Sequence, residues 1–340
     1  MATAPIDYRS FFNSTVYAVI EKMETMEADP VFTLGREEDH NVGSGDTVNW
    51  TSETLSTYLD IVPAGGDIPE TPVIQGDQLA RTFFSIKGNM AVTYESYLYN
   101  KLGLMFDKSE ELAEGAQNTA SLCLCGQLLT NASTTTQTVL GVTQNISCAD
   151  TLAPASASHT VPGAAGQTFT TIVTGTPALS DSSLDTARQV LIANNVDQAG
   201  VNRPVGSDFV LVIGENATMI KKAQQLTGSV LSPETPNNAI NVYSGGVMDF
   251  VVLRNSARNS AGQYSTTSQY YWMLSTKKAL KRNFRYRWSM RPSKPGEGLF
   301  PKYMEKNLDS RIYVMAGLVY GLPRWAGMAY SLSSTKPTTT

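Results

Sequence analysis

The chain has 340 residues, a mass of 36.8 kDa and a net charge of −4. This slightly acidic balance argues against a dedicated nucleic-acid binder. No apolar run approaches the roughly 18 residues that cross a bilayer, so no membrane association is expected. Charged residues make up 16% of the chain, below the roughly 25% of typical soluble domains. This low content fits either a surface partly covered by other molecules or a soluble protein rich in Ser and Thr.

The three cysteines, Cys123, Cys125 and Cys148, are too few and wrongly spaced for a disulfide framework or a zinc site. Cys123 and Cys125 fall within an apolar helical run, so buried free thiols are expected. The first residues contain neither a basic region nor an apolar core, so no signal peptide is expected. Both observations favour synthesis in a reducing cytoplasm.

Residues 8–26 predict an N-terminal helix. Val19 and Met23 lie on an apolar stripe at helical spacing, and Pro30 prevents the helix from continuing. This segment is interpreted as an N-terminal arm that contains one helix.

An acidic segment, residues 37–86, carries nine acids against one cation, Arg81, for a net charge of −8. Short alternating apolar runs surround the turn-forming residues Pro63 to Asp67. This pattern predicts a long two-stranded arm with a loop at its end, and residues 79–92 are expected to form the returning strand. A two-stranded ribbon is marginal in water by itself, so the arm is expected to lie on another surface.

Residues 94–130 form an unusually long helical pattern, which is expected to have two parts. A capping box at Asp107 marks the start of the second part, residues 108–130. This second helix would be about 35 Å long. Gly115 and Gly126 would weaken it by up to about 1 kcal/mol each, unless neighbours pack closely there.

Residues 131–183 are rich in Thr, Ser, Ala and Gly and contain no Lys or Arg. Their β-branched residues favour an irregular β insertion over disorder. A compact α/β unit follows. It is predicted to contain a helix at 184–196, a buried strand at 209–213, a helix capped by Asn216 and a strand at 247–253.

The last part of the chain predicts strands at 270–274 and 312–320, then a polar tail, residues 331–340, that is expected to be frayed. Between these strands lies the basic stretch, residues 277–306, in which ten basic residues stand against two acids for a net charge of +8. Aromatic residues alternate with arginines in it, so a strand would turn the aromatics to one face and the arginines to the other.

The basic stretch has two possible partners, which the sequence leaves open. It can contact nucleic-acid phosphates without sequence preference. It can equally pair with the acidic arm of another copy, because opposite patches on separate elements suit head-to-tail association. The candidate inter-subunit residues are Asp60, Asp67 and Glu70 in the arm and Arg285, Arg287 and Arg291 in the basic stretch.

Patterns that carry catalysis or cofactor binding are weak. His40 follows three acids, but ligands so close in sequence rarely converge, so a solvated arm base is favoured. His159 lies in a Ser/Ala loop without visible partners. The strand–turn–helix pattern at 209–216 has one glycine where a dinucleotide fingerprint needs three, and no phosphate-binding loop motif occurs. No enzymatic activity, cofactor or metal is therefore expected.

This order of elements resembles the major capsid protein of tailed bacteriophages, which has the Hong-Kong-97-type fold. The local matches are Asp67-Ile-Pro-Glu70 in the arm, the helix 108–130, the segment 211–223 and the closing segment 319–324. The insertion at 131–183, which contains no Lys or Arg, departs from that family.

The resemblance implies an α+β fold with five regions. They are an N-terminal arm (1–36), an extended hairpin loop (37–92), a peripheral domain with a long spine helix (93–145), an axial domain with the insertion (146–269), and closing strands with a C-terminal tail (270–340).

The resemblance also implies a function: self-assembly into an icosahedral shell that encloses phage double-stranded DNA. The partners would be copies of the chain in pentamers and hexamers, together with scaffolding, portal and decoration proteins, and the location would be the virion, assembled in the bacterial cytoplasm. Some members of the family cross-link a loop lysine to a neighbouring asparagine, but residues 37–86 contain no lysine, so a non-covalent shell is expected. The alternatives are an encapsulin-type bacterial compartment or, in a different class, a carbohydrate-binding or carbohydrate-modifying protein.

Overall fold

The computed structural model describes most of the chain and divides it into two compact units. The smaller unit comprises Met1–Ala28, Phe83–Ser121 and Arg287–Val319, and the larger comprises Asp29–Thr82, Leu122–Tyr286 and Tyr320–Thr340. The described residues are 8–38, 47–55, 58–59, 61–64, 66–68, 70, 73–92, 99, 101–228, 241, 243, 248–292 and 310–338. Helices and several separate sheets are both present, so the predicted α+β class is confirmed.

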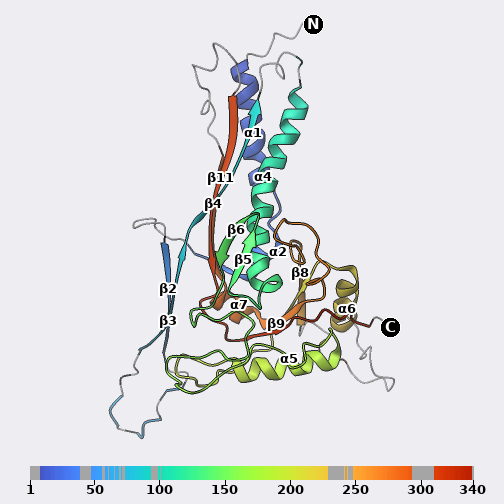
Figure 1. The fold of residues 1–340 in the computed structure, drawn as a ribbon. Helices are drawn as coiled ribbons and strands as arrows, with labels where there is room; N and C mark the ends of the chain where they lie inside the picture. Colours follow the sequence, from blue (N-terminus) through green and yellow to red (C-terminus); the bar gives the residue numbers. More distant parts are fainter. Residues whose placement is uncertain are drawn as a thin grey trace. The chain divides into compact units, whose positions relative to one another are not determined.

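The smaller unit packs two helices against strands. α1 (Tyr8–Thr25) and most of α4 (Leu102–Cys125) lie alongside β4 (Phe84–Val92) and β11 (Ser310–Gly321) in Figure 1. β4 and β11 are antiparallel, and together with β1 (Arg36–Glu37) and β10 (Arg285–Pro292) they belong to a sheet of order β1-β10-β11-β4. The buried core of this unit consists of Val16, Val19, Met105, Ala113, Ala116, Ile312 and Val314.

The long helix differs from its prediction in one respect. Asp107 lies inside α4 rather than at a cap, so the predicted break there is wrong. Met105, Ala113 and Ala116 continue one apolar stripe past Asp107, and burial of that stripe outweighs a local capping signal. The helix ends in a short π-helical turn, η1 (Gly126–Thr130).

The larger unit is built on a sheet of order β12-β9-β7-β8. Its strands are β7 (Phe209–Gly214), β8 (Met248–Leu253), β9 (Trp272–Thr276) and β12 (Met328–Ser331). β7 runs parallel to β8 and antiparallel to β9. Every residue of β7 is buried, as expected for a central strand with both faces covered.

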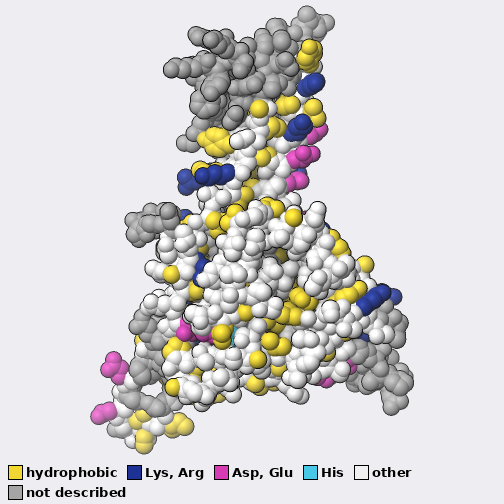
Figure 2. All heavy atoms as spheres, in the orientation of Figure 1, with side chains coloured by type: hydrophobic (Ala, Val, Ile, Leu, Met, Phe, Trp, Pro, Cys, Tyr) yellow, Lys and Arg dark blue, Asp and Glu magenta, His cyan; other side chains and the backbone are white. Residues whose placement is uncertain are grey.

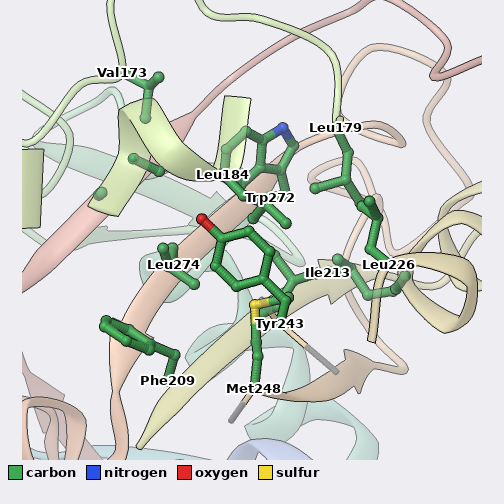
Figure 3. Packing of buried hydrophobic residues seen from close by; sticks show 14 of the residues in the cluster. Val173, Leu179, Leu184, Phe209, Ile213, Leu226, Tyr243, Met248, Trp272 and Leu274 are labelled. Carbon is green, nitrogen blue, oxygen red and sulfur yellow. The ribbon is translucent and has the colours of Figure 1, made fainter. Parts of the chain in front are cut away.

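Helices cover this sheet and close a single hydrophobic cluster. α5 (Asp181–Asn194) and α6 (Ala217–Gly228) contribute Leu184 and Leu226 to it, and Figure 3 shows these side chains around Tyr243 and Trp272. The predicted helices and strands of the α/β unit are therefore confirmed. Two short helices, α2 (Pro30–Leu34) and α7 (Lys277–Asn283), complete the unit.

The insertion forms a β-hairpin and irregular loops, as predicted. β5 (Thr136–Val139) pairs with β6 (Val142–Asn145), and an isolated bridge joins His159 to Phe169. Gly126 shows why a glycine is tolerated just after α4: a Cβ there would lie 2.0 Å from Gln137 Oε1.

The tail is better ordered than predicted. Met328–Ser331 forms β12 and pairs with β9, and Ser331 and Ser333 are buried. The predicted frayed tail was residues 331–340, and this prediction is wrong for Ser331, because it pairs with Trp272 of β9, and for Ser333, because its side chain is buried.

Candidate inter-subunit surfaces

The arm consists of β2 (Thr47–Leu55), β3 (Val73–Thr82) and the residues between them. The two strands form an antiparallel pair with a bulge between Thr51 and Glu53, and no third described strand joins them. The predicted two-stranded arm is therefore confirmed. The returning strand, however, is interrupted at Phe83, and β4 pairs with β11 instead of continuing the arm.

The base of the arm is fixed to the larger unit. Trp50 and Leu79 are almost fully buried. The Trp50 indole Nε1 donates a hydrogen bond to Glu38 Oε2 at 2.7 Å. Gly321 passes so close that a Cβ on it would lie 2.4 Å from the Trp50 ring. The arm therefore extends from a tightly packed base, in which Trp50 and Leu79 are buried against Gly321.

Arg81, the arm's one cation, serves this attachment. Its guanidinium Nη2 donates a hydrogen bond to the Ser147 carbonyl oxygen in the insertion. Burial lowers the pKa of Arg81 from its ordinary value. Arg81 is the one Lys or Arg in residues 37–86. Since it is engaged at the base, this segment supplies no other cation for the acids farther along the arm.

The arm tip, meaning the described residues between 58 and 70, exposes apolar side chains. Ile61 is 100% exposed and Ile68 is 95% exposed, and Leu59 is also exposed. Asp67 and Glu70 are exposed among them, and Figure 2 shows hydrophobic and acidic side chains together at the end of the arm. Contiguous exposed apolar side chains rimmed by polar ones are typical of a contact site.

Asp60, the remaining arm residue predicted to contact a neighbour, lies outside the described residues, as does His40.

The basic stretch has the alternation that its sequence predicts. Phe284 and Tyr286 are buried, whereas Arg285 is partly exposed and Arg291 exposed. Arg285 is not free for a neighbour, since its Nη1 lies 3.3 Å from Glu38 Oε1 and its Nε donates to the Arg282 carbonyl at 3.2 Å. Arg287 lies over the Phe83 ring at 5.6 Å. Arg285 thus joins the acidic and basic segments within one chain.

His159 has partners that the sequence did not reveal. It is fully buried, with Nδ1 2.6 Å from Asp150 Oδ2 and Nε2 3.2 Å from the Pro154 carbonyl oxygen, and its ring stacks on Trp325. The expectation of a partnerless loop histidine is wrong. Both ring nitrogens are engaged and away from solvent, so this pair has no free nitrogen for acid–base work on a substrate.

The turn after β7 has no cradle for a phosphate. A Cβ on Gly214 would lie 2.9 Å from Ser256 Oγ, which accepts a hydrogen bond from the Glu215 amide at 3.1 Å. Asn216 Oδ1 accepts from the amides of Thr218 and Met219 at the start of α6. The donors that would bind an anion at this helix end are occupied by the protein itself.

The described residues contain neither a metal centre nor a membrane-spanning helix. Among them, no group of three or more His, Cys, Asp or Glu side chains is arranged to hold a metal ion. None of the described helices is long and apolar enough to span a membrane.

The fold defines an α+β protein whose two-stranded arm exposes apolar and acidic side chains at its tip. No family model matches the chain, and no curated protein matches it in sequence.

Among solved structures, 145 chains match. One is the capsid of an empty GTA particle, 7% identical over 89% of each chain with a TM-score of 0.46. Another is the mature capsid of bacteriophage PhiM1, 10% identical over 90% of this chain and 87% of that one, also at 0.46. A third is a virus-like particle from Pyrococcus furiosus, 10% identical over 93% of this chain and 97% of that one, at 0.42. Likenesses at this level do not assign the chain to a family.

Proposed function

We propose that this chain is the major capsid protein of a tailed bacteriophage, with the Hong-Kong-97-type fold. It assembles with copies of itself, as pentamers and hexamers, into an icosahedral shell that encloses double-stranded DNA. Its place is the virion, built in the cytoplasm of a bacterial host. The observation that carries the proposal is the arm, which is anchored at its base and ends in exposed Ile61 and Ile68.

An exposed isoleucine is costly for a chain that stays alone. Full burial of such a side chain contributes about 1.5–3 kcal/mol of favourable free energy. At the arm tip this free energy is gained only when a partner covers the isoleucines. When the arm of each copy lies on a different surface of the next copy, the contact is heterologous, and repeated contacts of this kind form a ring where the rotation between copies closes. A ring-forming subunit is what a shell requires.

The surface of the larger unit fits the same proposal. Few Lys, Arg, Asp or Glu side chains appear on the face of this unit in Figure 2, in keeping with the 16% charged content of the chain. A subunit whose faces are covered by neighbours needs fewer charges for solubility than one that stays free.

The acidic arm and the basic stretch place opposite charges on the two sides of the contact. Exposed ion pairs contribute only about 0–1 kcal/mol each, so their role is to orient the arm on an adjacent subunit. Basic residues that the neighbour's arm does not reach face the packaged DNA and contact its phosphates without sequence preference. Scaffolding, portal and decoration proteins are further partners of such a shell.

The direct test is to express the chain alone and analyse it by sedimentation velocity and negative-stain microscopy. Uniform closed shells are expected. A protein that remains monomeric at all concentrations and salt conditions would overturn the proposal.

The contents of native particles separate the two shell functions. DNA inside particles from the source cell supports the phage capsid. An enclosed enzyme without DNA would identify an encapsulin-type compartment instead.

A further inference from the structure

A cavity of about 560 Å³ lies in the larger unit beside the edge strand β8. Its lining residues come from α2, α6, β7, β8 and α7, and α2 contacts both β8 and α7 (Figure 1). Ligand pockets in proteins typically have volumes of about 300–1,000 Å³ and are lined mainly by apolar side chains with a few polar groups. The size of this cavity therefore fits a small molecule.

Most of the cavity wall is apolar. The apolar lining residues are Leu34, Val210, Met248, Phe250, Val251 and Leu280. Phe250 and Val251 are partly exposed, whereas the other four are buried. Close packing around the buried side chains keeps the wall in place, so a ligand with an apolar body gains free energy by covering the two exposed ones.

The polar lining residues differ in what they can offer to a ligand. Thr33 Oγ1 donates to the Pro30 carbonyl oxygen at 2.7 Å, and Thr227 Oγ1 donates to the Ala223 carbonyl oxygen at 2.9 Å. A hydroxyl has one hydrogen to donate, and both are used within the protein. Among the described lining residues, the side chains that remain as donors are therefore two lysines on α7.

These two lysines, Lys277 and Lys281, have different surroundings. Lys277 Nζ donates to the Asp249 carboxylate, and this hydrogen bond, with the charges of Asp249 and Asp208, raises the pKa of Lys277. Lys281 is exposed, and no described acid forms an ion pair with it. The lining contains two lysines and one aspartate, so its net charge is +1, and Lys281 is the cation left for a ligand.

We infer that this cavity is a binding site for an amphipathic monoanion, a carboxylate carried on an apolar chain of the fatty-acid type. The carboxylate accepts a hydrogen bond from Lys281 Nζ, and the apolar chain packs against Val251 and Leu280. One negative charge matches the lining, whereas a second would stand uncompensated near Asp249. The site lies within one subunit, so the inference does not depend on the proposed assembly.

The test is isothermal titration calorimetry of the full-length subunit with octanoate as the probe. Saturable binding of one octanoate per chain is expected, with a Kd below about 1 mM. Octanol has the same chain without the charge, and acetate has the charge without the chain. Each should bind at least about tenfold more weakly than octanoate, because each lacks one of the two contacts.

Two lysine variants locate the site. Lys281→Gln should weaken octanoate binding at least about tenfold, since a neutral amide replaces the cation. Lys278→Gln is the matched control, because Lys278 is also an exposed lysine of α7 but does not line the cavity. It should leave the affinity unchanged, and circular dichroism should show that both variants are folded.

The outcomes are distinct. Failure of octanoate to saturate a single site overturns the inference, as does equal affinity for octanol. Equal affinities of the two lysine variants would show that octanoate does not contact Lys281, and they also overturn the inference. None of these measurements involves particles, so the proposed function stands or falls separately.

Discussion

Gly321 shows how one residue fixes the base of the arm. A Cβ at this position would lie 2.4 Å from the Trp50 ring and 2.9 Å from Leu79 Cδ2. Both of these side chains are buried, so neither can move away without disturbing its neighbours.

We therefore predict that Gly321→Val destabilises the subunit by about 1–3 kcal/mol through overpacking. Urea unfolding followed by tryptophan fluorescence measures this change. Gly206→Val is the control, because a Cβ there meets no atom within 4 Å. Equal unfolding midpoints for the two variants would contradict the predicted role of Gly321.

The individual environments of the three cysteines protect their thiols from reaction with solvent reagents. All three are buried thiols, and none forms a disulfide. Burial raises the pKa of Cys123 to about 11, although a hydrogen bond from Gln144 opposes the shift. Burial also raises the pKa of Cys148 well above its ordinary value. A raised thiol pKa means less thiolate, which is the reactive form.

At pH 8 we expect the folded protein to react with a disulfide reagent such as DTNB extremely slowly. For Cys123 the rise from 9.0 to about 11 lowers the thiolate fraction about 100-fold. Titration in urea should reveal three thiols, and titration of the folded protein should reveal none within minutes. Rapid reaction of one thiol in the folded protein would show that its surroundings are open.

At the scale of elements, α6 depends on Asn216. Its Oδ1 accepts from the Thr218 amide at 2.9 Å, and its Nδ2 donates to Tyr264 and Gln269 at 3.1 Å each. One side chain therefore caps the helix and ties it to the loop before β9.

Asn216→Ala removes both functions and should cost about 1 kcal/mol or somewhat more. Asn216→Asp keeps the capping oxygen and loses only the donor, so it should cost less. Thermal unfolding of the three proteins checks this order. If the aspartate variant is as unstable as the alanine variant, then the cap contributes little and the link to Tyr264 and Gln269 dominates.

At the scale of the whole molecule, the acids of the arm are expected to orient assembly. We predict that Asp60, Asp67 and Glu70 changed together to lysine block shell formation while leaving the subunit folded. The reversal brings positive charge to the basic stretch of the neighbour. Light scattering and circular dichroism provide the two measurements. Normal assembly of this variant at low salt would mean that the basic stretch faces DNA instead.

The shell is also expected to be non-covalent. Residues 37–86 contain no lysine, and Lys87 lies on β4, opposite Met315 of β11. Particles boiled in detergent should therefore give a single band near the chain mass of 36.8 kDa. A ladder of heavier bands that persists under reducing conditions would contradict this.

Much of the architecture could be predicted from the sequence because its signals are local. The helical spacing in α1, the run of apolar residues in β7 and the cap at Asn216 each lie within one element, so neighbouring residues suffice to identify them. The arm was predictable for the same reason, since its turn residues and its acids are contiguous in the sequence. The short apolar runs around its turn and the charge of the basic stretch were also visible as a pattern, whereas the exposure of Ile61 and Ile68 came from the structure.

Tertiary structure decided the features that join distant residues. The pairing of β12 with β9, the interruption of the arm strand at Phe83 and the continuous course of α4 past Asp107 each depend on a partner far along the chain. The burial of His159 against Asp150 and Trp325 is of the same kind, as is the Arg285–Glu38 ion pair. A sequence pattern records what a residue prefers beside its neighbours, but burial and pairing energies are set only once the fold brings remote segments into contact.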